Sequence, residues 1–248
     1  YYFLNKMTKY TSFTFFLFLL VSQTTIAQYG KNWAAYPMDS LEEVVIKSGK
    51  NWLPFIEKLS MDCGLYSLSA GSEDVQEPHK LDEAYYIVKG KATLVVQGKK
   101  QDVQKGSIVY VQANAKHKFE NITEDLLVLV FFSKRHPKPS NIPFQYFDYE
   151  ELLKEGHPKF NSTNSFLIAP TMNLGLSMMP QIKNGHEMVK HKVDEFSLVI
   201  NGKGKFALGK NDTVNVVPGT FLYVKDKVPH QFFDLEEDLE VLIMFEKE

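Results

Sequence analysis

The sequence predicts an all-β protein made of two tandem barrels with short flanking helices. Apolar runs separated by Gly-Lys turns, as in "AYYIVKGKATLVVQGKKQDVQKGSIVYV" from Ala84, indicate successive antiparallel strands. The second half of the chain repeats this pattern as "FSLVINGKGKFALGKNDTVNVVPGTFLYV" from Phe196. Many short strands at regular spacing favour a sandwich or a barrel. A duplicated barrel is therefore the expected fold.

An internal repeat supports this expectation. Residues of the first half recur 112 or 113 positions later, as the pairs His79 and His191, Glu83 and Glu195, Gly90 and Gly202, Gly106 and Gly219, His117 and His230, and Asn121 and Asp234. The segment "EDLLVLVFF" from Glu124 likewise matches "EDLEVLIMF" from Glu237. A repeat of this length is typical of a duplicated structural unit.

Each unit is expected to begin with a short helix. "DSLEEVV" from Asp39 and "DYEELL" from Asp148 each start with an acidic capping residue and run toward a glycine, Gly49 or Gly156. We place the first unit at residues 28–134 and the second at residues 144–248. The Pro-rich segment 135–143 is predicted to be an extended linker.

The N-terminal segment has the layout of a secretory signal peptide. Lys6 and Lys9 precede an apolar run from Phe15, and Ala27 is a suitable residue before a cleavage site. Residues 1–27 are therefore predicted to be removed, and the rest of the chain has no apolar run of membrane-spanning length. We expect a soluble protein, secreted or periplasmic, with no membrane contact after cleavage.

Charge and cysteine content exclude several classes of protein. The net charge is −2, and no block of like charge suggests a nucleic-acid partner. Cys63 is the one cysteine, so an intramolecular disulfide is excluded. The expected partner is a small molecule, and self-association into a homodimer is left open.

The repeated motifs resemble those of the cupin superfamily. Its first motif is G-x5-H-x-H-x3,4-E-x6-G, and its second is G-x5-P-x-G-x2-H-x3-N. Both units fit at the second histidine, the glutamate and the following glycine, and again at the glycine and histidine of the second motif. In place of the first histidine the chain has Glu77 in one unit and Val189 in the other. The resemblance covers essentially the whole chain after residue 27 and implies two cupin-type double-stranded β-helix (jelly-roll) barrels.

The resemblance also implies metal sites. Imidazole and carboxylate groups bind divalent transition metals, and two histidines with one carboxylate form an open-sided ligand set. The implied ligands are His79, Glu83 and His117 in unit one, with Glu77 as a fourth candidate, and His191, Glu195 and His230 in unit two. The expected cofactor is Fe, Mn, Ni or Zn.

A geometric condition applies to both sites. Four residues of straight strand span about 13 Å, so the chain must bend at "KLD" and at "KVD" before each glutamate. Tyr85 shares the parity of Glu83 along the strand and is a candidate substrate-binding residue. Trp33 and Trp52 are interpreted as packing between the units. His186 is a weaker candidate for the missing ligand, and a loop position is preferred.

Two classes of function remain open. The first is an exported metal-dependent enzyme of dioxygenase, decarboxylase, isomerase or lyase type that acts on a small polar or sugar-like molecule. The second is a non-catalytic small-molecule or sugar-binding protein with degenerate metal sites. The loss of one histidine per unit favours the second class, and the retention of His, Glu and His in both units favours the first. The sequence does not decide whether the protein is an enzyme.

Overall fold

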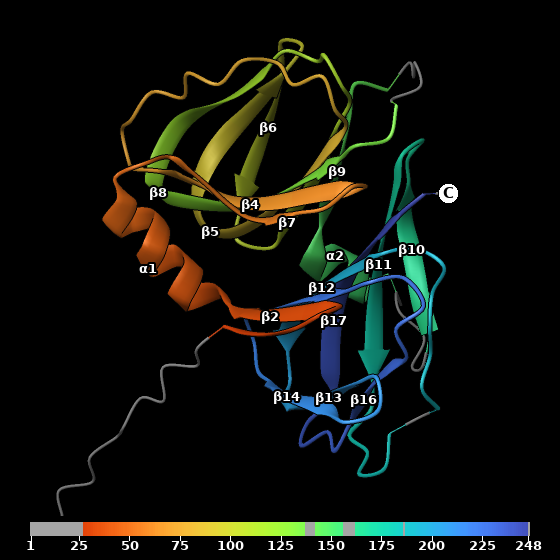
Figure 1. Ribbon diagram of the computed structural model, residues 1–248. Coiled ribbons are helices and arrows are strands. Elements are labelled where there is room, and N and C mark those ends of the chain that lie inside the picture. The colour runs from red at the N-terminus through yellow and green to blue at the C-terminus, as the bar shows by residue number, and fades with distance from the viewer. Residues whose placement is uncertain (1–26, 137–141, 156–161, 186, 248) are drawn as a thin grey trace, which may run out of the picture.

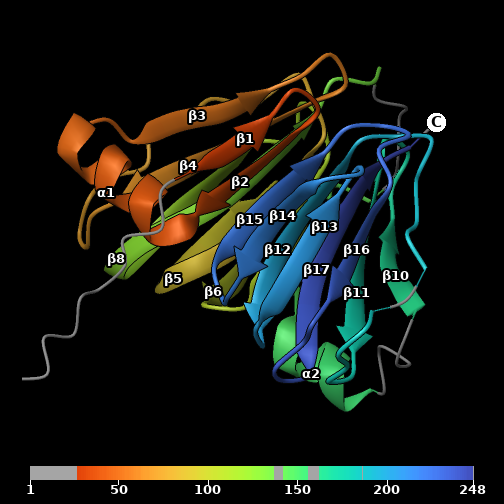
Figure 2. The ribbon, with the colours of Figure 1, turned by 60° about the horizontal axis from the view of Figure 1, so that its bottom comes forward.

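The computed structural model describes residues 27–136, 142–155, 162–185 and 187–247, which form two β-barrel units (Figures 1 and 2). The expected all-β fold with two short flanking helices is confirmed. Apart from Ala27, the predicted signal peptide lies outside the described residues, as do residues 137–141 of the predicted linker.

The first unit is one antiparallel sheet that curls into a barrel. Its strands are β3 (Trp52–Glu57), β4 (Met61–Leu68), β5 (Glu83–Val96), β6 (Lys99–Gln104), β7 (Ser107–Val111) and β8 (His117–Ser133). Their order is β3-β4-β8-β5-β7, followed by β9 (Phe144–Asp148), and β6 pairs with β5 outside this path.

The second unit repeats this arrangement with two sheets. Its strands are β10 (Ser162–Ile168), β11 (Met172–Met179), β12 (Glu195–Asn201), β13 (Gly204–Leu208), β14 (Asp212–Val216), β15 (Thr220–Val224), β16 (His230–Phe233) and β17 (Leu239–Glu246). One sheet has the order β1-β2-β15-β12-β17-β11-β10, where β1 is Gln28–Gly30 and β2 is Trp33–Pro37, and the other is β14-β13-β16.

The motif glycine of each unit lies where another segment of backbone approaches closely. Gly90 has φ +90°, and a Cβ there would lie 2.4 Å from the carbonyl oxygen of Asp125. Gly202 has φ +86°, and a Cβ there would lie 2.3 Å from the carbonyl oxygen of Asp238. Any other residue would therefore be in a disfavoured backbone conformation, and its Cβ would clash with backbone atoms. This close approach explains why glycine recurs in the repeat.

The two units exchange strands. Strand β2, which lies at the start of the first unit in the sequence, pairs with β15 of the second unit, with Ala35 opposite Leu222. In the same way β9 pairs with β7 of the first unit, with Tyr146 opposite Val109. The division of the sequence at residues 135–143 stays a prediction. In space, the first barrel includes β9 from after this segment, and the second barrel includes β2 from before it.

A helix follows each exchanged strand. Helix α1 spans Met38–Ser48 and ends at Gly49, which has the left-handed conformation. The predicted acidic cap at Asp39 is wrong, because Asp39 lies in the first turn and Pro37 is the capping position. Helix α2 spans Tyr149–Lys154, and here the predicted cap is confirmed, since Asp148 accepts a hydrogen bond from the Glu151 amide. Neither helix has the length and apolar character needed to cross a membrane, a finding that covers only the described residues.

Three apolar cores hold the molecule together. One fills the first barrel around Ile87 and Leu94, and a second fills the second barrel around Phe206 and Val241. The third lies between the units and combines side chains of both, including Met61 and Phe196. Burial of this shared surface is the main force expected to hold the units together.

Candidate metal centre

Three of the predicted ligands of the first unit converge inside its barrel. His79 lies in the segment before β5, Glu83 is the first residue of β5, and His117 is the first residue of β8. One ligand atom from each lies within 4.8 Å of the others. The Nε2 atom of His117 is 3.1 Å from Oε1 of Glu83, and Nε2 of His79 is 3.8 Å from Oε2. The expected bend is present, because the residues between His79 and Glu83 are not part of a strand.

The protonation pattern of His117 suits a metal ligand. Its Nδ1 atom lies 2.8 Å from the Ala115 carbonyl oxygen, which can only accept a hydrogen bond, so the proton is on Nδ1. The lone pair of Nε2 then points toward Glu83. Among the described residues, neither this nitrogen nor either oxygen of Glu83 has a hydrogen-bond partner, although all three are buried. Buried polar atoms without partners are costly, and a shared cation would satisfy all three.

The second unit repeats the arrangement. His191, Glu195 and His230 also place one ligand atom each within 4.8 Å of the others. The Nε2 atoms of His191 and His230 lie 3.2 Å and 3.3 Å from Oε2 of Glu195. Nδ1 of His230 is 2.9 Å from the Val228 carbonyl oxygen, which again leaves Nε2 to face the glutamate.

The two glutamates differ in one neighbour. The position of Tyr85 in the first unit is taken by Ser197 in the second. The Ser197 hydroxyl donates a 2.7 Å hydrogen bond to Oε1 of Glu195. Burial alone would raise the pKa of Glu195, but its contacts with His191, His230 and Ser197 lower that pKa to about 2. Burial lowers the pKa of His230, and the contact with Glu195 outweighs this and raises it overall.

In the first unit burial dominates. It raises the pKa of Glu83 well above its usual range and lowers the pKa values of His79 and His117. In the second group the contacts of Glu195 favour its charged form, whereas in the first group burial favours the neutral form of Glu83, so that a bound cation is what would stabilise its charge. The first group thus has the greater need for an added cation.

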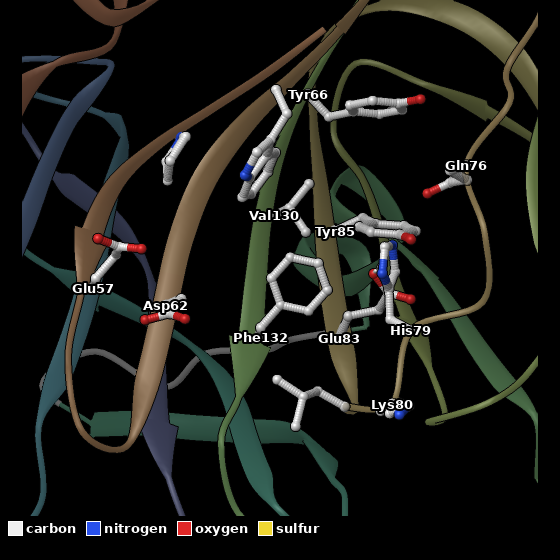
Figure 3. Close-up of a pocket in the computed structure, with 13 residues that line it drawn as sticks. Glu57, Asp62, Tyr66, Gln76, His79, Lys80, Glu83, Tyr85, Val130 and Phe132 are labelled. Carbon is white, nitrogen blue, oxygen red and sulfur yellow. Dashed lines mark ion pairs between the residues drawn. The ribbon is translucent and has the colours of Figure 1, made fainter.

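The first group opens onto a pocket. This pocket has a volume of about 480 Å³. Its lining includes His79 and Glu83 together with the aromatic side chains of Trp52, Tyr66, Tyr85 and Phe132. Figure 3 shows His79, Glu83 and Tyr85 on one side of the pocket, with Glu57 and Asp62 at the opposite end.

The wall of the pocket is largely aromatic. The ring of Phe132 packs edge-on against His79, with 5.0 Å between centroids, and against Trp52, with 5.8 Å. The Tyr85 hydroxyl lies close to Glu83, is buried, and is without a hydrogen-bond partner among the described residues. An apolar wall with a few converging polar groups is typical of small-molecule sites.

The remaining predicted residues fall elsewhere. Glu77 is exposed and belongs to neither group, so the structure does not bring it to His79. The interpretation of Trp52 as packing between units is wrong, because it lines the pocket and contacts the core of the first barrel. Trp33 packs against the core of the second barrel. His186 lies outside the described residues.

One structural residue of the site was not predicted. Asp74 is buried and accepts hydrogen bonds from the Tyr66 hydroxyl at 2.6 Å, the Gln76 side chain at 2.7 Å and the Phe119 amide at 2.7 Å. It thereby holds the segment before His79 against the barrel. Nothing in the sequence pattern marks Asp74, because its partners are distant along the chain and the repeat has no counterpart for it.

Comparisons with known proteins support the barrel fold that carries these residues. Residues 64–132 match the model of the family described as "Cupin domain". The chain is 43% identical over 99 residues to the uncharacterized protein SCO3923 of Streptomyces coelicolor, covering 40% of this chain and 94% of that protein.

Solved structures extend the similarity of fold over both units. Salicylate 1,2-dioxygenase from Pseudaminobacter salicylatoxidans superposes with a TM-score of 0.69 at 14% identity, covering 91% of this chain and 87% of that one. A "Cupin 2 conserved barrel domain protein" from Leptotrichia buccalis gives a TM-score of 0.64 at 16% identity, covering 79% of this chain and 88% of that one. At these identities the likeness establishes the fold alone.

Proposed function

The chain belongs to the cupin family, and on that premise we propose that it is a bicupin that holds a divalent transition metal at His79, Glu83 and His117. The observation that carries the proposal is the convergence of three buried ligand atoms without partners beside an aromatic-walled pocket. Fe, Mn, Ni and Zn all accept this set of nitrogen and oxygen ligands.

The proposed metal would act as a Lewis acid toward an oxygen of a small molecule in the pocket. The chain supplies the surroundings. His117 is held by its bond to Ala115 with Nε2 toward the metal position, and Glu83 adds the negative charge. The Tyr85 hydroxyl, beside Glu83, could donate a proton or a hydrogen bond to a bound molecule.

The pocket supports a ring-shaped ligand. A flat apolar face, as in a sugar or an aromatic ring, fits the walls formed by Trp52 and Phe132. Polar oxygens on its edge would then face the metal position. We propose a reaction of dioxygenase, decarboxylase, isomerase or lyase type on such a molecule, and salicylate 1,2-dioxygenase is a fold neighbour with chemistry in this range.

The pattern of residues 1–27 supports export, and we propose a secreted or periplasmic location. Expression of the full sequence in a bacterium, followed by N-terminal sequencing of the exported protein, tests this part. A protein that begins at Gln28 supports it. An uncleaved protein retained inside the cell contradicts it.

Elemental analysis tests the metal site. The protein is purified without chelator beside His79→Ala and His191→Ala, with His136→Ala as a control because His136 is exposed and outside both groups. We expect near-stoichiometric metal in the wild type and in the control, and its loss in His79→Ala. Absence of metal after reconstitution with Fe, Mn, Ni and Zn would overturn the proposal. Stable metal binding with ligand binding but no turnover would favour the non-catalytic function.

A further inference from the structure

An aspartate directly precedes the glutamate of each group, and its contacts reach into the other unit. Asp82 is fully buried. Its Oδ1 atom accepts a 2.9 Å hydrogen bond from the Ala113 amide, and its Oδ2 atom accepts a 2.7 Å hydrogen bond from the Thr171 hydroxyl. Thr171 lies between β10 and β11 of the second unit and is itself buried. One of the two bonds that hold this buried carboxylate therefore comes from the other unit.

The same loop that bonds Asp82 also holds His79. The Asn114 amide, next to that of Ala113, donates a 2.7 Å hydrogen bond to the His79 carbonyl oxygen. Asn114 has φ +63°, the conformation that turns successive amides toward this segment. In addition, the Ser133 amide of β8 donates to the Asp82 carbonyl oxygen at 3.0 Å. The bend from His79 to Glu83 is thus fixed at both ends.

The second unit contains the corresponding contacts. The Asp226 amide donates to Oδ1 of Asp194 at 2.9 Å, and the Lys227 amide donates to the His191 carbonyl oxygen at 2.7 Å. The Ser60 hydroxyl of the first unit lies 3.5 Å from Oδ2 of Asp194. Ser60 occupies the place in its unit, directly before β4, that Thr171 occupies directly before β11. Each unit therefore provides a hydroxyl to the aspartate of the other unit. The hydrogen bond from Thr171 to Asp82 is short and buried, whereas the contact of Ser60 with Asp194 is long and partly buried.

We propose that Asp82 is a positioning residue for the metal site of the first unit and that Thr171 of the second unit sets its orientation. This rests on the proposed function, because it assumes a metal at His79, Glu83 and His117. Asp82 and Glu83 are adjacent, so rotation of the aspartate moves the backbone that carries the ligand. Residues that orient ligands typically change metal affinity by about 10- to 100-fold when they are altered.

The test uses Co²⁺ titration of the full chain, with the visible absorption of bound Co²⁺ as the signal. All variants are made in a His191→Ala background, so that the signal reports the first group. Thr171→Val removes the hydroxyl at nearly constant volume, and Thr171→Ser restores it. Ser60→Ala is the matched control, since it alters the equivalent contact at the second group.

We expect Thr171→Val to weaken Co²⁺ binding about 10- to 100-fold and to change the absorption spectrum. Thr171→Ser should restore both, and Ser60→Ala should leave both unchanged. Unchanged affinity and spectrum in Thr171→Val, even with a lower melting temperature, would overturn the proposal. An equal loss in Ser60→Ala would also overturn it.

Two further results separate the possible failures. If Thr171→Val does not fold, Asp82→Asn, which keeps the shape of the side chain, decides by the same titration. Failure of the His191→Ala background itself to take up Co²⁺ would overturn the proposed function together with this inference. If the background binds Co²⁺ and neither Thr171→Val nor Asp82→Asn changes its affinity, only the inference is overturned.

Discussion

Replacing each buried glutamate by glutamine should affect the metal-free protein in opposite directions. Glu83 and Glu195 occupy equivalent positions, and both are buried. Each has two histidine nitrogens within 3.8 Å. They differ at one oxygen, because Oε1 of Glu195 accepts a hydrogen bond from the Ser197 hydroxyl, whereas neither oxygen of Glu83 has a hydrogen-bond partner among the described residues. We expect Glu195→Gln to destabilise the chelator-treated protein and Glu83→Gln to stabilise it.

The size of the first effect follows from the pKa of Glu195. A decrease from 4.5 to about 2 corresponds to about 3 kcal/mol at about 1.4 kcal/mol per pH unit. Because this pKa is lowered, the stabilisation is present above pH 4.5 and is lost as the pH falls toward 2. The pKa of His230 is raised by the same interaction, so the stabilisation is also lost as the pH rises above 6.5 and through the raised value. At pH 6 the contribution is complete.

The amide of Glu195→Gln keeps part of the hydrogen bonding, so the loss should be about 1–3 kcal/mol. For a chain of this size that corresponds to a fall in melting temperature of roughly 2–10 °C. The pKa of Glu83 is raised, so its folded form binds a proton more tightly than its unfolded form and stability falls as the pH rises. A neutral amide removes that loss.

Differential scanning calorimetry at pH 6 and pH 8 in chelator measures both effects. Glu57→Gln is the control, because Glu57 is an exposed acid at the far end of the pocket. We expect a lower melting temperature for Glu195→Gln at pH 6 and a higher one for Glu83→Gln at pH 8. Shifts of the same sign and size in the two variants would refute the reasoning, because they would show that Ser197 and Tyr85 do not set the difference.

Three further predictions concern the fold, the metal and the pocket. Gly90→Ala should prevent stable folding, whereas Gly98→Ala, with no atom within 4 Å of the added Cβ, should remain folded by circular dichroism. Metal affinity at the first group should rise with pH in calorimetric titrations, because Glu83 must lose its proton to bind; a pH-independent affinity would contradict this. The variant Trp33→Phe keeps Trp52, which lines the pocket, and Trp52→Phe keeps Trp33, which packs on the second barrel. Added Cu²⁺ should therefore quench the tryptophan fluorescence of Trp33→Phe more strongly. Equal quenching in the two variants would refute a metal site beside Trp52.

The sequence predicted the β fold from local patterns, whereas the meeting of His79, Glu83 and His117 was implied by the resemblance of the motifs to those of cupins. Strand alternation and Gly-Lys turns are readable along the chain, and the motif spacing recurs in both units. Whether these residues bind a metal stays a prediction. The Asp-Glu pair at positions 82 and 83 recurs at 194 and 195, and this repeat was the available signal for the positioning role proposed for Asp82.

Other features depend on partners far away in the sequence. The place of Glu77 follows from the course of the preceding loop, which Asp74 fixes through bonds to Tyr66 and Phe119. Trp52 faces the pocket because of the register of β3 on β4, which a single strand does not reveal. Pairing of this kind is decided by tertiary structure, so pattern analysis missed it.

The exchange of strands has a consequence for the order in which the chain folds during synthesis. The first sheet is complete once residue 148 is available, since β9 is its last strand. Strand β2 is made much earlier, yet its partner β15 ends at Val224. Strand β2 can pair with β1 at once, but its other edge must wait for β15 until most of the protein exists. Cutting the chain between the units would leave β7 and β15 as open edges, and such halves should aggregate unless they are supplied together.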